Sequence, residues 1–565
     1  MKKIYLAILF ASLAGLSSCD DFLDAEPSDK IAESNFWQSE TDLNKFVTDI
    51  YASTFPVIYE GSLFFDEAFS DNAYNVYTSW YTDVKLVANG TQDAYASTPY
   101  TWWKLYYASI RKCCNVLENA PKMQSIEESV KNRLLAETKF LLAWDYYRLI
   151  SFFGDVPFVT KVLSLEDSEG LTRTSANEIA TSLQTWLDES SSVLQGIEQE
   201  KGRITWGACQ LLKARIFLWQ HNYEEALNVV EGLIGKYCLY KSGETPYIDL
   251  FSGAAEDAPE IILSIIRERT VGSVRTGHSA NQTFFLKGMS GGDAFRAITP
   301  TGSLVDSYPM LDGRLIHENG STYDPRNPYK DRDPRLLQSI LCPTMQLKYL
   351  DSSTGEVKET LYDPEDVSTI PEQQYSAKEP SSTGYMWMKY VDWSPYAMTD
   401  ITDCSNDLIL MRYAEVLLIK AEALAELKGV AEKNAIIDIV DELRDRARCG
   451  RVHRENYNTQ EELINLVRNE RRIELANEGQ RYFDLIRWRV AEKNTIRDGQ
   501  GLEGDCYGAY MRLDGVGSSD RTVLVDGVPR RFVETRYFRP ERDYLQPIPQ
   551  YERDLNPNLT QNPNW

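Results

Sequence analysis

Apolar and small residues recur at three- and four-residue spacing through much of the chain, which predicts a mainly α-helical protein. The pattern is strongest at residues 206–234 and 408–447, and each segment reads as two antiparallel helices. The turns are predicted at His221 and Asn222 in the first segment and near Gly429 in the second. Neither helix of such a pair can bury its apolar face alone, so we expect tetratricopeptide-like repeats that stack on one another. Further helices are predicted at residues 36–55, 101–119, 126–153, 176–196, 461–477 and 481–489.

The pattern changes between about 236 and 407, where Gly, Pro, Ser, Asn and Asp cluster repeatedly. These residues signal turns, and only short runs such as EIILSII at 260–266 are typical of strands. The tail from residue 495 onward is similarly loop-rich, with a β-like run at 522–528. Long irregular regions between regular elements are where binding loops usually occur.

The amino terminus has the features of a bacterial lipoprotein signal. A basic start precedes an apolar run at residues 4–14, which is too short to cross a membrane. The sequence LSSC at 16–19 resembles a lipobox, so we expect cleavage after residue 18 and lipidation of Cys19. The alternative is a plain secretory signal with an incidental cysteine. Several acyl chains on one cysteine would anchor the protein stably, and residues 19–35 would form an acidic tether.

Together these patterns predict one large fold on a lipid anchor. The predicted parts are a removed signal peptide at 1–18, a lipidated tether at 19–35 and a single fold at 36–565. Within the fold, helical repeats are predicted mainly at 36–235 and 408–494. A loop-rich insertion is predicted at about 236–407 and a loop-rich tail at 495–565.

Composition narrows the classes of function. The chain has 60 Lys and Arg against 84 Asp and Glu, and its net charge of −24 argues against a nucleic-acid partner. Only four histidines are present, and the chain contains no H-E-x-x-H, G-x-S-x-G or Walker A motif. None of the eight cysteines after Cys19 forms a C-x-x-C pair, so we expect most of them to be small buried apolar residues. We therefore predict no catalytic residue, no metal site and no cofactor.

Several short motifs occur in order along nearly the whole chain. They are FLD at 22–24, NFW at 35–37, FGDVP at 153–157, DRDPR at 331–335, LMRYAEVLL at 410–418, ERR at 470–472, EGQRYFDLIRW at 478–488, LQPIP at 545–549 and NLTQNP at 558–563. Together they resemble the SusD/RagB family of outer-membrane nutrient-binding lipoproteins of Bacteroidetes. The acidic segment after Cys19 is also similar to the surface-export signal of lipoproteins from these bacteria.

This resemblance implies a fold, a ligand and a partner. The fold would be about four tetratricopeptide-like helix pairs packed against a loop-rich half with short strands. The ligand would be a glycan or oligosaccharide, and the partner a SusC-like TonB-dependent transporter that receives it without catalysis. The protein would lie at the outer membrane, anchored through Cys19 and exposed at the cell surface.

The charged residues at 470–488 alternate with apolar residues on a helical period. They could form a charged ligand site, but partly buried charges need local partners, and we favour a packed helix turn held by ion pairs. By the same reasoning we assign Trp103, Tyr107 and Asn115 to the scaffold, because they occur at helical spacing and match scaffold positions of the family.

A glycan site should instead consist of loop-borne aromatic residues. A flat ring stacks on the C–H face of a sugar, while amides and charged groups meet its hydroxyls. The first candidate segment is 71–81, with Asn75 as a hydrogen-bonding residue and the rings of Tyr77, Trp80 and Tyr81.

Two further loop segments are candidates for the same site. The second contains Phe284, Phe285 and Arg296, and the third contains Tyr385, Met386, Trp387 and Trp393. For each segment the alternative is that the aromatic residues fill a core beneath the loops.

Two rival functions stay open. A glycoside hydrolase on a helical scaffold is possible, because among 84 carboxylates some pair must lie at the required spacing of about 5–10 Å. A tetratricopeptide-type adaptor that binds peptides on its helical face is the other alternative.

Overall fold

The structure is a computed structural model that describes residues 37–55, 63–76, 82–270, 277–285, 294, 297–351, 354–362, 364, 383–510 and 522–565. The predicted signal peptide, Cys19 and the tether therefore lie outside the described residues. None of the helices in the described part of the chain is long and apolar enough to cross a membrane.

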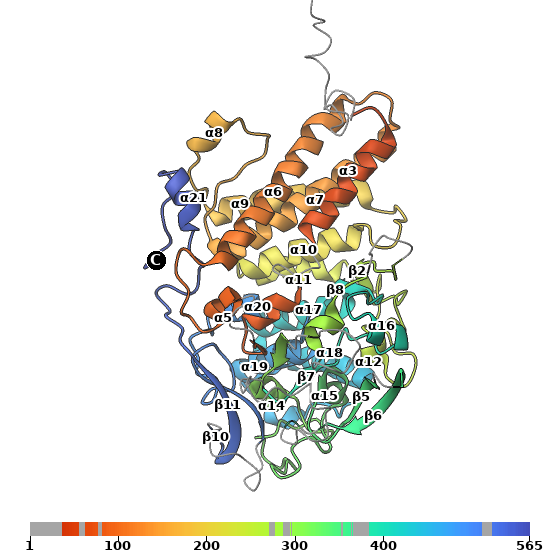
Figure 1. Ribbon diagram of the computed structural model, residues 1–565, viewed down its shortest axis with the longest axis vertical. Coiled ribbons are helices and arrows are strands. Elements are labelled where there is room, and N and C mark those ends of the chain that lie inside the picture. The colour runs from red at the N-terminus through yellow and green to blue at the C-terminus, as the bar shows by residue number, and fades with distance from the viewer. Residues whose placement is uncertain are drawn as a thin grey trace, which may run out of the picture.

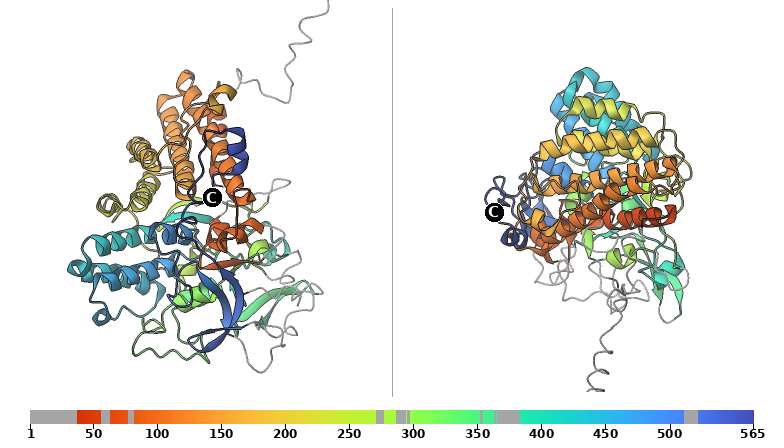
Figure 2. Two further views of the ribbon diagram at one scale, coloured as in Figure 1. Left: turned by 90° about the vertical axis from the view of Figure 1, so that its left-hand side faces the viewer. Right: turned by 90° about the horizontal axis from the view of Figure 1, so that it is seen from above.

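The described chain is mainly α-helical, as predicted. Its longer helices are α3 (Glu40–Thr54), α6 (Ser97–Asn119), α7 (Glu128–Phe153), α9 (Ala176–Leu194), α10 (Trp206–Trp219), α11 (Tyr223–Glu231), α17 (Tyr413–Leu427), α18 (Lys433–Ala447) and α19 (Gln460–Glu474). Successive helices pack side by side, α6 on α7, α7 on α9, α9 on α10, α10 on α11, α11 on α17, and α17 on α18 and α19. Figures 1 and 2 show this stack, in which helices from both ends of the sequence form one repeat array.

Local sequence explains where these helices begin. Ser39 and Asp42 form a capping box at the start of α3, because each side chain bonds the backbone N–H of the other residue. The predicted turn at His221 and Asn222 is confirmed, and the Asn222 side chain caps α11. The turn near Gly429 is also confirmed, with Gly429 at a positive φ of 53°.

One predicted helical segment is wrong in part. Residues Leu408–Arg412 form strand β8, and α17 begins only at Tyr413. Strand β8 pairs antiparallel with β2 (Ile261–Ile265), the segment predicted as a strand. All five residues of β8 are buried and the first four are apolar, and a continuous apolar run has no period that separates a strand from a helix.

The loop-rich part contains short helices and small antiparallel sheets. The short helices include α4 (Leu63–Ala68), α5 (Thr82–Ala88), α8 (Leu165–Glu169), α12 (Pro246–Asp249), α13 (Ala280–Phe284), α14 (Gly302–Ser307), α15 (Pro334–Ser339), α16 (Pro395–Thr399), α20 (Arg481–Arg487) and α21 (Gln550–Leu555). The other strands are β1 (Ala73–Asn75), β3 (Ile298–Pro300), β4 (Ile340–Leu341), β5 (Gln346–Asp351), β6 (Glu356–Leu361), β7 (Met386–Trp387), β9 (Gly504–Tyr510), β10 (Thr522–Val525) and β11 (Val528–Arg536).

The β-like run predicted at 522–528 forms strand β10 and a tight turn. Asp526 and Gly527 both have positive φ, which suits the two-residue hairpin that joins β10 to β11. Strand β11 also pairs with β9, a strand that the sequence pattern did not indicate.

Buried ion pairs join the loop-rich part to the helical repeats. Glu474 accepts hydrogen bonds from Arg335 at 2.8 Å and Arg412 at 2.7 Å, and it also pairs with Arg446. Burial alone would raise the pKa of Glu474, but these three guanidinium groups outweigh it and hold the pKa well below its usual value. The interpretation of the 470–488 charges as packing residues is therefore confirmed for Glu474.

Seven of the eight described cysteines are buried and all eight are free, with Cys238 the exposed exception. Their expected role as small apolar core residues is thus confirmed for most of them.

Candidate functional site

Two of the predicted site segments are hydrogen-bonded to each other at their bases. Strand β1 pairs antiparallel with β3, so that Asn75 lies opposite Ile298. The backbone N–H of Val76 continues the ladder by donating to the carbonyl oxygen of Ala297 over 2.8 Å. Tyr77 follows Val76 directly and Arg296 precedes Ala297 directly, so the first and second segments start from neighbouring points.

The third predicted segment is tied to the second. The Asn281 side chain on α13 donates to the carbonyl oxygen of Asp392 at 2.7 Å and accepts from the Asp392 N–H at 3.0 Å. The rings of Phe285 and Trp393 lie 5.3 Å apart between centroids, and strand β7 lies beside β3. The described parts of segments 71–81, 284–296 and 385–393, called here the converging segments, therefore meet in one region.

The exposure expected of Phe284 and Phe285 is wrong. Both side chains are fully buried, and the Phe284 ring packs against Phe64 of α4 at 4.8 Å in an edge-on contact. Tyr385 and Trp387 are also fully buried. These aromatic residues fill the core beneath the loops, together with aliphatic neighbours such as Ile298 and Ile340.

Asn75 also lies inside the protein, with 1% of its surface exposed, so it does not offer the free amide that the prediction required. The remaining predicted site residues lie outside the described part of the chain, and their roles stay predictions. They are Tyr77, Trp80, Tyr81 and Arg296 in the site and Cys19 at the lipid anchor.

An exposed aromatic residue that we did not predict lies next to this region. Tyr396 on α16 is 39% exposed, and the guanidinium group of Arg269 lies 4.7 Å from its ring centroid. Its hydroxyl donates to Asp403 at 2.7 Å, and this bond raises the pKa of Tyr396, so the phenol stays neutral. The sequence signal is weak: Tyr396 comes three residues after Trp393, in a short helix that Ser394 caps and Pro395 begins.

The base of the first segment is fixed by buried carboxylates. Asp71 accepts two hydrogen bonds from Arg481, at 2.7 and 2.8 Å, and Asp66 pairs with Arg148 at 2.7 Å. Glu67 accepts from the Asn72 amide at 2.7 Å. Burial raises the pKa of Asp66 to about 6 and that of Glu67 to about 7.

The described part of this region therefore presents paired carboxylates at its base and the exposed ring of Tyr396 at its edge. The carboxylates at its base are paired with guanidinium groups or backbone N–H groups, which suits a structural role. Within the described ranges, no three His, Cys, Asp or Glu side chains are close enough to hold a metal ion.

Comparison with known proteins gives a consistent result. The model of the SusD family matches residues 259–565, which is more than half of the chain. A second model, described as "Starch-binding associating with outer membrane", matches residues 21–218.

Among characterised sequences, SusD-like protein P38 of Formosa agariphila is 25% identical over 509 residues, which cover 85% of this chain and 90% of that protein. Starch-binding protein SusD of Bacteroides thetaiotaomicron is 24% identical over 432 residues, which cover 70% of this chain and 71% of that protein.

Solved structures show the same likeness. A SusD-like carbohydrate binding protein from Bacteroides fragilis superposes with a TM-score of 0.77 at 26% identity, covering 93% of this chain and 100% of that one. Surface glycan-binding protein A of Bacteroides thetaiotaomicron, solved in complex with laminarihexaose, has a TM-score of 0.66 at 17% identity. The superposition covers 92% of this chain and 99% of that protein, and at this identity it shows a likeness of fold alone. From the family model and the shared helical-repeat architecture, we conclude that the chain belongs to the SusD family.

Proposed function

We propose that this protein is a cell-surface lipoprotein that binds a glycan at the converging segments. The observation that carries the proposal is the hydrogen bond between Val76 and Ala297, because it holds the residue that precedes the aromatic run in the sequence beside the residue that follows Arg296. Tyr77, Trp80 and Tyr81 would stack on sugar rings, and Arg296 would meet hydroxyl groups. Tyr396, held by Arg269 and Asp403, would extend this aromatic surface at its edge.

Relatives support a saccharide as the ligand class. One relative is named as starch-binding, and a protein of the same fold is solved with laminarihexaose. On this proposal the protein binds and releases its ligand without cleaving it, and passes it to a SusC-like TonB-dependent transporter. A lipid on Cys19 would hold the protein at the outer membrane beside that transporter.

Affinity electrophoresis tests the binding step. The full chain is run through native gels containing starch, laminarin, xylan or pectin, with Trp80→Ala as the site variant. We expect at least one polysaccharide to retard the protein, and Trp80→Ala to lose retardation at an unchanged melting temperature. Retardation by none of a broad panel, or steady release of new reducing ends above a heat-killed control, would overturn the proposal.

The delivery step needs a separate measurement. Outer membranes from the native host are solubilised, and the protein is captured through an epitope tag at its carboxyl end. We expect a SusC-like transporter to co-purify in near-equal amount. The Cys19→Ala variant should lack the added mass of the lipid and should no longer associate with the membrane. Absence of a transporter from the captured material would remove delivery while leaving glycan binding in place.

A further inference from the structure

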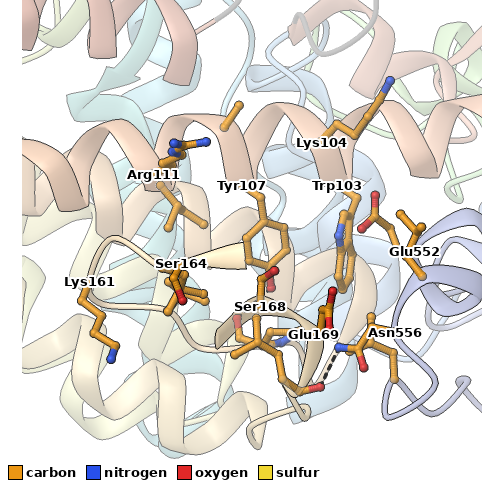
Figure 3. A pocket seen from close by; sticks show the side chains of 18 residues that line it. Trp103, Lys104, Tyr107, Arg111, Lys161, Ser164, Ser168, Glu169, Glu552 and Asn556 are labelled. Carbon is orange, nitrogen blue, oxygen red and sulfur yellow. Dashed lines mark hydrogen bonds between the residues drawn. The ribbon is translucent and has the colours of Figure 1, made fainter. Parts of the chain in front are cut away.

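A cavity of about 730 Å³ lies away from the converging segments, between α6, the loop at 157–171 and the end of α21. We call it the α6 cavity, and Figure 3 shows the side chains that line it. In Figure 1, α8 and α21 lie beside the upper helices, whereas α16 lies on the opposite side among the strands. Its volume falls within the range of about 300–1,000 Å³ that is typical of small-molecule sites.

One polar group in the wall of this cavity has no partner. Trp103 is 4% exposed, and its ring packs against Phe153 at 5.3 Å and Tyr107 at 4.9 Å. This packing agrees with its assignment to the scaffold, but the indole N–H finds no acceptor among the described residues, although the ring lines the cavity (Figure 3). The neighbouring Tyr107 hydroxyl differs, because it donates to the carbonyl oxygen of Pro157 at 2.7 Å.

The indole nitrogen of Trp103 is not among the fully enclosed atoms that lack a partner, so solvent in the cavity can reach it. Polar groups in such positions are usually satisfied by ordered water or by a ligand. The indole N–H of Trp103 is therefore available to an acceptor oxygen inside the cavity, next to an apolar wall that Tyr107 and Leu559 provide.

The rim of the cavity carries positive charge on a strongly acidic protein. Arg111 and Lys161 both line the cavity, and neither makes an ion pair within the described part of the chain. Lys104 lies over the Tyr100 ring at 4.3 Å. The acidic lining residues are Glu169 and Glu552, and burial raises the pKa of Glu552. The rim can therefore attract an anionic group, although the whole chain has a net charge of −24.

We propose that the α6 cavity is a second saccharide site, which binds an oligosaccharide carrying carboxylate or sulfate groups. An anionic group of the ligand contacts Arg111 and Lys161 by charge-assisted hydrogen bonds. A hydroxyl or ring oxygen accepts from the indole N–H of Trp103, and the apolar wall takes the C–H face of the sugar. This inference goes beyond the proposed glycan site and does not depend on it.

A protein partner is the rival occupant, because Leu555 and Tyr551 are exposed nearby at 78% and 49%. The observations favour a saccharide: the surface is concave, the unpartnered donor lies within the cavity, and stable protein interfaces bury larger areas of about 800 Å² per partner. The test must therefore distinguish a bound saccharide from a bound acidic, partly apolar peptide.

Isothermal titration calorimetry on the full chain makes that test. The probes are a hexagalacturonate, which carries carboxylates, a sulfated carrageenan hexasaccharide, neutral maltohexaose, and a peptide of residues 20–35 of this chain. The variants are Arg111→Gln, Lys161→Gln and Trp103→Phe, and the last removes the N–H while keeping an aromatic ring. Lys45→Gln on α3 is the matched control, since Lys45 is exposed and makes no ion pair within the described residues.

We expect one acidic hexasaccharide to bind, more weakly as salt rises, and Arg111→Gln and Lys161→Gln each to weaken it about tenfold. Trp103→Phe should weaken it about three- to tenfold, whereas Lys45→Gln and Trp80→Ala leave its affinity unchanged. The two acidic probes distinguish carboxylate from sulfate recognition.

Three results would overturn the proposal. They are the absence of binding by either acidic probe, wild-type affinity in both Arg111→Gln and Lys161→Gln, and binding of the 20–35 peptide in place of both saccharides. Trp80→Ala reports only on the converging segments, and Arg111→Gln and Lys161→Gln report only on the α6 cavity. A failure of the α6 cavity proposal can therefore be distinguished from a failure of the proposed glycan site.

Discussion

The N–H of Val76 donates to the carbonyl oxygen of Ala297 over 2.8 Å, although the two residues are far apart in the sequence. This bond ends a short ladder between β1 and β3 and fixes the point from which both loops leave the scaffold. Because Asp71 also pairs with Arg472 of α19 at 3.3 Å, the ladder itself is attached to the helical repeats. The repeats thus position loops whose own sequences are free to suit a ligand.

Tyr396→Ala should weaken glycan binding without unfolding the protein. The Tyr396 side chain is 39% exposed, so its loss leaves no large cavity, while a stacking surface beside the site disappears. We expect about three- to tenfold weaker binding of whichever polysaccharide retards the wild type, measured by affinity electrophoresis and by melting temperature. Tyr537→Ala is the control, because Tyr537 is 55% exposed in the carboxyl-terminal part of the chain. Equal losses in both variants would contradict a role of Tyr396 in the site.

Phe284→Ala should act on stability rather than on ligand contact. The side chain is fully buried and packs on Phe64, so truncation removes buried apolar area and leaves a cavity. Such changes cost about 3–5 kcal/mol of the free energy of unfolding. Urea denaturation followed by fluorescence gives this value. If Phe284→Ala were as stable as the wild type but bound the glycan more weakly, Phe284 would be a ligand-contacting residue after all.

The helical repeats could be predicted from sequence because their apolar faces repeat every three to four residues. The turn at Asn222 could be predicted for the same reason, and its side chain also has the chemistry of a helix cap. Strand β8 could not, because its first four residues, Leu408 to Met411, are all apolar and carry no period. Its identity depends on pairing with β2, about 150 residues earlier in the chain.

The candidate site was predictable only as a region. Aromatic residues in loops serve equally as sugar platforms and as core, and only tertiary contacts show that Phe284 is core whereas Tyr396 is exposed. The α6 cavity could be predicted from the sequence even less. The periodicity correctly assigns Trp103 to packing, but which of its atoms lacks a partner depends on the loop at 157–171 and on α21.

Glu474→Gln should destabilise the whole fold. The carboxylate of Glu474 serves Arg335, Arg412 and Arg446 in a fully buried setting, and the substitution leaves these guanidinium groups short of negative charge. Removing one member of a buried ion pair typically costs about 3–5 kcal/mol. Denaturant midpoints measure this loss.

The matched control for that experiment is Asp445→Asn, which breaks the exposed ion pair with Arg451. We expect no shift of its midpoint, because exposed pairs contribute little. If Glu474→Gln were as stable as this control, the buried network would not hold the loop-rich part on the repeats.

Glu67→Gln should change how stability depends on pH. Burial raises the pKa of Glu67 from 4.5 to about 7, so the folded protein keeps a proton that the unfolded chain releases. Between about pH 4.5 and pH 7 the folded state therefore binds more protons, and the free energy of unfolding falls as the pH rises. The slope from this one group is at most about 1.4 kcal/mol per pH unit. Glutamine does not titrate, so the variant should lose this part of the slope while the contribution of Asp66 persists.

Urea midpoints at pH 5, 6 and 7 measure the difference between wild type and variant. Glu461→Gln is the control, since Glu461 is an exposed carboxylate in the first turn of α19 and should leave the pH dependence unchanged. Glu67 accepts hydrogen bonds from Asn72 and from the N–H of Gly479, so the variant is expected to be less stable than the wild type at pH 5. The test is the change of stability with pH, and not this constant difference in stability between the two proteins. Parallel curves for wild type and Glu67→Gln would mean that Glu67 stays charged in the folded protein, with the two donors outweighing its burial.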